Sequence, residues 1–553
     1  MNFHGIDAFP KIASMNAKRL VLPLGLATVC LLALVIRLWG IAFGLPFTYH
    51  PDEPQHVLQA LAIAHRLPQG LTFHNPPLYK YLLLGEYILT FVIGHIAGTF
   101  ASPHDFVNQF RADPTRVYLV ARITSAVLGT ALVAVVYRLG VKLLRRRVGF
   151  VAAIFTAVTY SLVRESHFAV NDALVTLLTT VELYATLCVL ERGTRREYLV
   201  AGALAGLAFS AKYQGAVVLT PLVVAHFFRA QRRWRDLFLA LGAAIVTVVI
   251  SFPSLWLETN RVLHDIYLNL YQGQTTGYDG LDPVGGYGFY AKALGVGLGL
   301  PLLVSACIGM GLTLQRRERT WLVLASFPIA LYLVLGYEKM YFARYILPAV
   351  PPLILFAARA LDDFLSRLQQ ALGRDTVLGT TMLGVVLVLG LAAPPLLNSL
   401  RFDLISTRTD TRTLARDWIE SHLPRGVKIA SDWYPFAPAL DPKHYDLLLA
   451  NGWALYDLTP DDYRQRGVEY LVTTSFIYDQ WVRDGERDAR RTLFYNQLAR
   501  EAQLIAEIRP TRGTETLAFV YDQLYAPYDQ LEKIERPGPT VRVYHILSHA
   551  ASR

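Results

Sequence analysis

"RLWGIAFGLPFTYHPDEPQH", residues 37–56, marks the point where the first long apolar run of the chain ends and charged residues gather. Two acids stand side by side there, Asp52 and Glu53, with Pro51 before them and Pro54 after them. Ionisable side chains at the edge of a membrane span are costly, and by default they mark a functional site. The stretch therefore predicts a membrane-spanning helix that leads into a charged site.

The two neighbouring acids allow two interpretations. Pro54 suits the first turn of a helix, so Asp52 or Glu53 can cap that helix, where negative charge is favourable. A residue before a proline is extended, so the two carboxylates should point in different directions. One acid is enough for a cap. The second interpretation is a general base that deprotonates an acceptor hydroxyl, with a partner that orients the substrate.

Apolar runs recur along most of the chain, and they indicate a multi-pass membrane protein. Of the 553 residues, 53% are hydrophobic and 17% are charged, whereas a soluble protein has about 25% charged residues. Each run is near the roughly 20 residues that cross a bilayer. We expect about eleven spans, near residues 20–43, 117–141, 148–163, 173–190, 198–211, 214–229, 236–254, 292–314, 320–336, 346–366 and 376–397.

The basic residues gather in short connectors at 142–147, 191–197, 229–235 and 315–319. The positive-inside rule places these connectors and the N-terminus in the cytoplasm. The formal net charge of +10 is therefore a consequence of topology, and nucleic-acid binding is not expected. An odd number of spans then places the C-terminal tail outside.

The first outer loop, about residues 44–116, contains an apolar stretch at 78–98. If this stretch crossed the membrane, the basic connectors would fall outside, against the charge rule. We therefore expect a helix that lies in the outer interface, with Lys80, Glu86 and His95 toward water.

The composition changes at about Arg401, which divides a membrane domain (1–400) from an extracytoplasmic α/β domain (401–553). "TRTLARDWIESHLPRGVKIAS" and "PDDYRQRGVEYLVTTSF" each predict a helix followed by a strand. "FYNQLAREAQLIAEI" predicts an amphipathic helix, and "TVRVYHIL" a closing strand.

The segment "FHNPPLYKYLL", residues 73–83, has the features of a helix start. Asn75 can cap a helix whose first turn holds the two prolines. A cap does not account for His74 and Lys80. We expect these two side chains to flank the outer surface and to position substrate.

The segment "RESHFAVNDALVTLL", residues 164–178, opens another apolar helix at Asn171 and Asp172, and capping alone can account for these two residues. Arg164 and His167 stand in the same short loop. This is more charge than a cap needs, so we expect a catalytic role for Asp172 and positioning roles for Arg164 and His167.

Four cations stand near outer span ends: Arg37, Lys212, Lys339 and Arg344. Any one of them can extend its charged end to lipid headgroups. Together they can bind a phosphate at the outer membrane face, because Arg makes bidentate phosphate contacts and Lys makes point-charge contacts.

Metal and disulfide chemistry have little support. The three cysteines, Cys30, Cys188 and Cys307, lie far apart and without CxxC spacing. Four histidines stand in the outer segments without a specific metal-ligand spacing: His50, His56, His74 and His167. We therefore expect no cofactor, and a divalent metal stays an open alternative.

Several of these motifs together resemble the GT-C superfamily of membrane glycosyltransferases. They are residues 37–56, "HNPPLYKYLL" at 74–83, the outer-loop Asp172, and "RYILPAVPP" at 344–352. The pattern is most similar to the family-39-like branch, which includes protein O-mannosyltransferases and lipid A aminoarabinose transferases. The tail "RPGPTVRVYHI", 536–546, is similar to the endings of bacterial members.

This resemblance implies a sugar donor on a polyprenyl phosphate, used at the outer face of a bacterial inner membrane. It implies that Asp52 activates the acceptor, that Glu53 completes the acidic pair, and that Asp172 is the second outer-loop acid. It also implies that Lys212 and Arg344 lie near the carrier phosphate. The chain departs from the family pattern at Asn75, which separates His74 from the prolines, and no metal site is carried over.

We therefore expect an inverting glycosyltransferase that moves a hexose or pentose to an extracytoplasmic hydroxyl on a protein, lipid A, a glycolipid or a polysaccharide. One alternative is a transporter or flippase of a lipid-linked glycan, although the sequence lacks half-to-half symmetry and its charges gather at one face. A second alternative is a scaffold whose tail binds partners, in which the acids would be dispensable.

Overall fold

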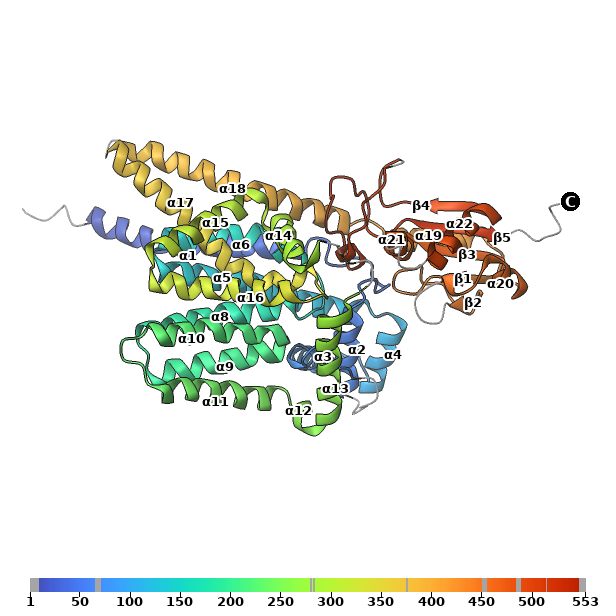
Figure 1. Cartoon of the computed structure of the whole chain (residues 1–553), viewed down its shortest axis with the longest axis horizontal. Coiled ribbons are helices and arrows are strands. Elements are labelled where there is room, and N and C mark those ends of the chain that lie inside the picture. The colour runs from blue at the N-terminus through green and yellow to red at the C-terminus, as the bar shows by residue number, and fades with distance from the viewer. Residues whose placement is uncertain are drawn as a thin grey trace, which may run out of the picture.

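The computed structural model describes residues 9–64, 71–278, 281, 284–373, 376–449, 455–483, 489–513 and 515–546. Figure 1 shows a long helical bundle with a small α/β domain at one end of it. The helices of the bundle are α1 (Phe9–Leu38), α5 (Thr115–Leu143), α6 (Arg146–Val158), α7 (Tyr160–Arg164), α8 (Asp172–Glu191), α9 (Arg195–Ala211), α10 (Leu219–Phe228), α11 (Trp234–Ser251), α14 (Gly285–Leu298), α15 (Leu300–Arg316), α16 (Arg319–Tyr337), α17 (Val350–Leu372) and α18 (Val377–Ser406).

Within the described residues, six helices are long and apolar enough to cross a membrane, or seven if one bent pair forms a single span. Two further apolar helices, Leu24–Leu38 and Tyr213–Phe228, are shorter. The chain is thus built as a multi-pass membrane protein, while the number of about eleven spans stays a prediction.

A bend interrupts the span that was expected near 292–314. α14 and α15 meet at an angle of 114°. Gly299 stands at the bend with φ of 78°, a conformation that glycine adopts without steric cost. α15 then begins with a proline in its first turn, which cannot continue the hydrogen bonding of the preceding helix.

Further helices of the described chain lie at the end of the bundle that faces the α/β domain: α2 (Glu53–Ala64), α3 (Leu78–Ile96), α4 (Pro103–Ala112), α12 (Ser254–Leu257) and α13 (Thr259–Tyr271). Figure 1 shows α3 and α13 running across the bundle helices. α3 exposes apolar side chains such as Ile88, Leu89 and Ile93, as an interfacial helix would. The expectation that Lys80 faces water is wrong, because its ammonium is buried and donates to Gln59 Oε1 (2.6 Å) and Thr72 O (2.7 Å).

Among its described residues, the α/β domain holds a five-stranded sheet of order β2-β1-β3-β5-β4. β1 pairs in parallel with β2 and β3, whereas β5 is antiparallel to β3 and β4. Its strands and helices are β1 (Lys428–Ser431), β2 (Asp446–Leu449), β3 (Tyr470–Thr474), β4 (Ala502–Ile508), β5 (Val541–Ile546), α19 (Thr411–His422), α20 (Pro460–Gln465), α21 (Ser475–Arg483) and α22 (Ala489–Glu501).

The two predicted helix-then-strand units and the closing strand are present as α19–β1, α20–β3 and β5. The predicted helix at 494–508 is only half right, because α22 ends at Glu501 and β4 follows at once. Pairing of Ala502–Ile508 with β5 overrides the helical pattern of that half.

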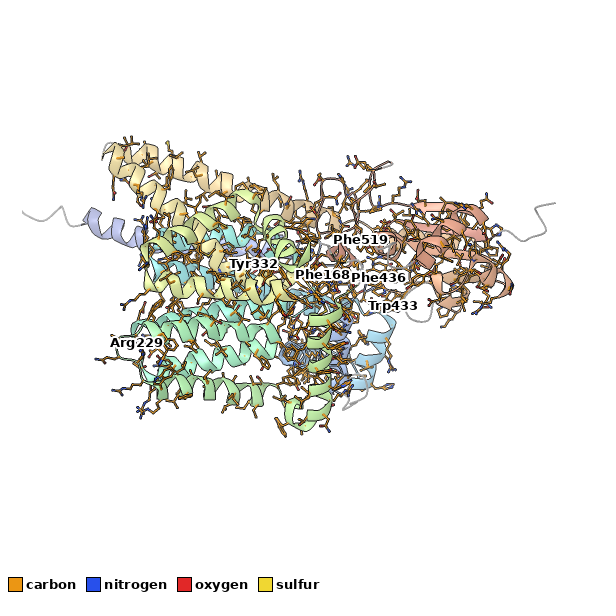
Figure 2. The ribbon with its side chains drawn as sticks, viewed as in Figure 1. Phe168, Arg229, Tyr332, Trp433, Phe436 and Phe519 are labelled. Carbon is orange, nitrogen blue, oxygen red and sulfur yellow. The ribbon has the colours of Figure 1, made fainter. Side chains whose placement is uncertain are left out.

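Short helical turns complete the chain: η1 (Tyr213–Val218), η2 (Gln272–Thr276), η3 (Ala343–Ala349), η5 (Leu455–Asp457) and η6 (Tyr521–Leu524). Figure 2 shows Arg229, in a basic connector, at the bundle end far from the α/β domain, and Phe168 at the junction of the two parts. The basic connectors and the charged outer segments thus lie at opposite ends of the bundle.

Candidate active site

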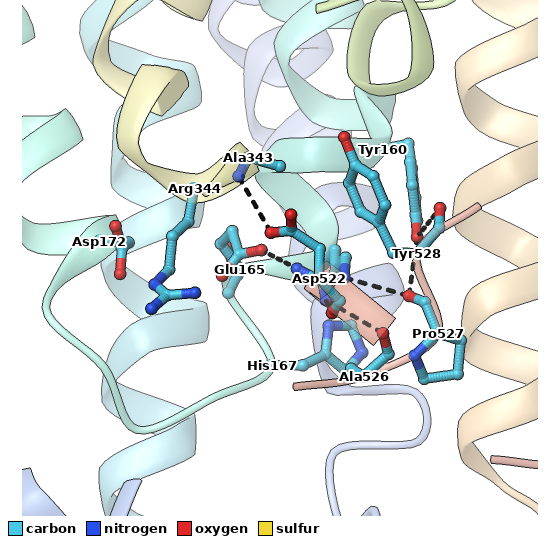
Figure 3. A network of polar contacts seen from close by, with 12 residues as sticks. Tyr160, Glu165, His167, Asp172, Ala343, Arg344, Asp522, Ala526, Pro527 and Tyr528 are labelled. Carbon is cyan, nitrogen blue, oxygen red and sulfur yellow. Dashed lines mark hydrogen bonds and ion pairs between the residues drawn. The ribbon is translucent and has the colours of Figure 1, made fainter. Parts of the chain in front are cut away.

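Two ion pairs stand together where α2, α8, η1 and η3 meet. Asp52 precedes α2, and its Oδ2 lies 3.0 Å from Nη2 of Arg344 in η3. Asp172 is the first residue of α8, and its Oδ1 lies 2.7 Å from Nζ of Lys212, which precedes η1. Figure 3 shows Asp172 and Arg344 on neighbouring elements. We call these four residues the ion cluster.

The members of the ion cluster act on one another through a poorly hydrated environment. Burial lowers the pKa of Lys212, whereas Asp172 and Asp52 raise it. The exposed fraction is 8% for the Lys212 and Arg344 side chains, 2% for Asp172 and 23% for Asp52. Asp52 is therefore the member most open to a ligand.

Burial raises the pKa of Asp52 above its ordinary value, while Arg344 and Lys212 lower it and two further carboxylates raise it. The Asp52 carboxyl group is thus a stronger base than an exposed aspartate. Two cations nearby keep its ionised form accessible.

A cleft of about 380 Å³ adjoins the ion cluster, a size typical of small-molecule sites. Its polar wall includes Lys212, Asn269 and Glu338, and burial raises the pKa of Glu338 to about 7. Its apolar wall includes Phe209 from α9 and Val334 from α16. The cleft is thus lined by one cation and one acid as well as by apolar side chains of the bundle helices.

Aromatic rings hold both cations in place. The Arg344 guanidinium lies 4.0 Å from the ring centre of Tyr525, 4.4 Å from that of Phe342 and 5.4 Å from that of Tyr345. Lys212 Nζ lies 4.6 Å from the Tyr345 ring. Such contacts attract a cation to the face of the ring.

Glu53, which was expected beside Asp52 in the catalytic pair, points elsewhere. Its two oxygens accept from Arg122 Nε and Nη2, each at 2.7 Å, and Oε1 also accepts from Ala169 N at 2.8 Å. Arg122 in turn donates to two carbonyls of the loop after α1. Glu53 is fully buried, so it ties α2 to α5 and lies outside the ion cluster.

Capping by side chains does not account for Asn75 and Asn171, because Pro77 is the N-cap residue of α3 and Asn171 precedes α8 without a side-chain capping hydrogen bond. Asn171 Nδ2 instead donates to Ala211 O (2.7 Å) and to Asn75 Oδ1 (3.3 Å). His74 lines the cleft, and its carbonyl accepts from Asn269 (2.6 Å). These contacts join the loop before α3 to the cluster end of α8.

Arg37, Arg164 and His167 do not join the ion cluster. Arg37 is fully buried among α1 and α6 and donates to Ala33 O and Ala157 O, each at 3.0 Å. His167 Nε2 lies 3.3 Å from Asp403 of α18. Arg164 forms an ion pair with Glu165 and binds a segment of the C-terminal tail. We therefore leave Arg37 out of the candidate phosphate site.

The tail residues that reach this site, above all Asp522 and Tyr525, are not among the residues predicted from the sequence. One signal was present: "YDQL" occurs twice, at 521–524 and 528–531, in a run dense in tyrosine and acid. For metals, the described part of the chain has no group of three or more His, Cys, Asp and Glu side chains placed to hold an ion, and a metal requirement stays untested.

A family model described as dolichyl-phosphate-mannose-protein mannosyltransferase matches residues 116–256. This region includes Asp172 and Lys212. No curated protein sequence matches the chain.

Two solved structures are similar to this chain over most of its length. The oligosaccharyltransferase of Archaeoglobus fulgidus has a TM-score of 0.51 at 14% identity, over 83% of this chain and 71% of that chain. ArnT from Cupriavidus metallidurans, solved bound to undecaprenyl phosphate, has a TM-score of 0.51 at 15% identity, over 94% of this chain and 97% of that chain. The family-model match and these structural similarities show that the chain has the fold of the GT-C superfamily of membrane glycosyltransferases.

Proposed function

We propose that the protein is a glycosyltransferase that moves a sugar from a polyprenyl-phosphate carrier to a hydroxyl group outside the membrane. The observation that carries the proposal is the ion cluster, whose Lys212 lines a cleft that apolar side chains of the bundle also line. The family-model match and the GT-C fold support it. The acceptor is a protein, lipid A, a glycolipid or a polysaccharide, and the sugar is a hexose or a pentose.

The donor would use both walls of the cleft. Its prenyl chain belongs with the apolar side chains, such as Phe209 and Val334, where hydrocarbon leaves water. Its phosphate belongs with Lys212 and Arg344. A guanidinium can bind a phosphate in a bidentate manner, and an ammonium adds a point charge.

In the transfer step, the acceptor oxygen attacks the anomeric carbon of the sugar, and Asp52 takes the proton of that hydroxyl. A new bond forms between the anomeric carbon and the acceptor oxygen. The bond from that carbon to the phosphate oxygen breaks, and its electron pair stays on the phosphate. A single displacement of this kind inverts the anomeric centre.

The charges of the ion cluster suit this step. The carrier phosphate gains one negative charge as it leaves, while Asp52 loses one by protonation. The total charge in the site therefore does not change. Lys212 and Arg344 face the phosphate oxygens where the negative charge develops, and such preorganised charges stabilise a transition state.

The proposal also assigns a direction across a bacterial inner membrane. The ion cluster and the α/β domain would face the periplasm or the cell exterior, and the basic connectors would face the cytoplasm. The carrier supplies the leaving group, so no nucleotide sugar is needed outside the cell. The remaining partners are membrane lipids.

The test is mass spectrometry of glycans and glycolipids from a deletion strain and its parent. We expect the deletion to remove one sugar from one class of acceptor and to leave the polyprenyl-phosphate sugar in excess. The wild-type gene should restore the sugar, and a gene with Asp52→Asn should not. Identical profiles in parent and deletion strain, or full restoration by Asp52→Asn, would contradict the proposal.

A further inference from the structure

A segment of the C-terminal tail, residues 521–528 ("YDQLYAPY"), enters the end of the bundle. Buried Arg164 donates to three of its carbonyls, those of Asp522 (2.9 Å), Pro527 (3.0 Å) and Ala526 (3.1 Å). Tyr160 OH donates to Pro527 O at 2.9 Å. Figure 3 shows this network, in which α7 of the bundle holds the tail segment.

The same segment contacts the element that carries Arg344. Oδ1 of buried Asp522 accepts from Ala343 N at 2.9 Å. Ala343 opens the η3 turn, and Arg344 is the next residue. The tail therefore fixes the backbone at the point where the Arg344 side chain leaves it.

Tyr525 extends this contact to the guanidinium. Its ring centre lies 4.0 Å from Cζ of Arg344, nearer than the rings of Phe342 and Tyr345. Phe342 and Tyr345 come from the Arg344 segment itself, whereas Tyr525 comes from the C-terminal domain. The ring of His50, two residues before Asp52, lies 5.4 Å from the Tyr525 ring.

We propose that Tyr525 is a positioning residue for Arg344, so that the C-terminal domain completes the phosphate site of the bundle. The guanidinium has a flexible stem, and its planar face stacks well on an aromatic ring. The ring of Tyr525 holds it beside Asp52, whose Oδ2 lies 3.0 Å from Nη2. This inference rests on the proposed role of Arg344 as a ligand of the carrier phosphate.

The test is the affinity of the purified full-length protein for undecaprenyl phosphate in lipid nanodiscs. We expect Tyr525→Leu to weaken binding about tenfold, a loss within the range of a desolvated cation–π contact. Tyr525→Phe keeps the ring but loses the hydroxyl contact with Arg344, and it should recover most of the affinity. Affinity that is retained in Tyr525→Phe and lost in Tyr525→Leu would show that the ring, rather than the hydroxyl, positions the guanidinium.

The chain offers a matched control in Tyr528, whose ring lies 5.2 Å from Cζ of Arg164 and not over Arg344. Tyr528→Leu removes an aromatic side chain from the same segment, and we expect wild-type affinity. If Tyr525→Leu does not fold, Tyr525→Met provides the same test, because Met fills irregular space without a ring. Thermal unfolding of each variant reports its folding.

The outcomes separate this inference from the function that it rests on. If the wild type does not bind undecaprenyl phosphate, or if Arg344→Gln binds it equally well, the proposed phosphate site is wrong. If Arg344→Gln weakens binding but Tyr525→Leu does not, the positioning role is wrong and the site stands. Equal losses in Tyr525→Leu and Tyr528→Leu would assign Tyr525 to docking of the segment and would also overturn the inference.

Discussion

The ion cluster and the Glu53–Arg122 ion pair both bury charge. An acid of each comes from two residues that are adjacent in the sequence, Asp52 and Glu53. Glu53 accepts three hydrogen bonds, and its side chain and that of Arg122 are both fully buried. Asp52 keeps 23% of its side chain exposed and pairs with Arg344 in the ion cluster, of which Lys212 lines the cleft. The two acids thus differ in partners and in access, although their sequence context is nearly the same.

This difference indicates which buried carboxylate can act as a general base. A carboxylate whose oxygens are all engaged by fixed donors gains stability from them and has no free position for a substrate proton. A partly exposed carboxylate, with a raised pKa and a cation on one side, can take a proton. The predictions below test this division, beginning with the largest effect.

Asp52→Asn should reduce sugar transfer by about 10²- to 10⁴-fold, the usual contribution of a general base. The variant should still enter the membrane and unfold at nearly the wild-type temperature, since Asp52 is partly exposed. The measurement is initial rate together with thermal unfolding of the same preparation. Wild-type transfer by this variant would remove Asp52 from the mechanism.

Glu53→Gln should act mainly on stability. Removing one partner of a buried ion pair lowers the free energy of unfolding by about 3–5 kcal/mol. Here the charge of Arg122 would be left without its partner. We expect a lower free energy of unfolding in chemical denaturation, with transfer lost only in proportion to the unfolded fraction. A Glu53→Gln protein that is as stable as wild type and yet inactive would place Glu53 in the catalytic group after all.

Arg344→Gln should shift the pH dependence of transfer. Asp52 must be ionised to act as a base, so activity is present above its pKa and is lost as the pH falls through it. Burial raises this pKa, and Arg344 and Lys212 lower it. Loss of the Arg344 charge raises the pKa further, so the acid limb of the kcat/KM profile should move to higher pH. An acid limb at the wild-type pH would show that Arg344 does not act on the base.

Lys339→Ala should have the smallest effect. Its side chain is exposed and donates to Thr275 O at 3.1 Å, outside the ion cluster. We expect transfer within about twofold of wild type, as is usual for an exposed surface charge. A large loss in the same rate assay would extend the cationic site beyond Lys212 and Arg344.

Much of the fold follows from sequence patterns alone. The apolar runs predict the helices of the bundle, and the two helix-then-strand units of the tail appear as α19–β1 and α20–β3. Patterns fail where a distant segment decides the structure. β4 forms because β5 lies beside it, and the turn at Gly299 divides an apolar run that is long enough to be one span.

For the candidate site, the sequence identifies Asp52, Asp172, Lys212 and Arg344 as unusual charges, and the structure brings these four together. The sequence alone does not distinguish the two cations of this group from Arg37 and Lys80, which are also an arginine and a lysine beside apolar runs. Their difference lies in tertiary contacts, because Arg37 and Lys80 are engaged by backbone carbonyls. Tyr525 lies far from Arg344 in the sequence, and local patterns carry no information about such a contact.

The most direct test of the account is release of free prenyl phosphate by the purified protein. The protein is incubated with the lipid-linked sugar that accumulates in the deletion strain, with and without the acceptor that lacks this sugar there. We predict that wild-type protein releases undecaprenyl phosphate only with acceptor, in equal amount to the sugar transferred, and that Asp52→Asn binds the lipid but releases none. Release by Asp52→Asn at the wild-type rate, or lipid movement across the bilayer without any release, would contradict the central claim.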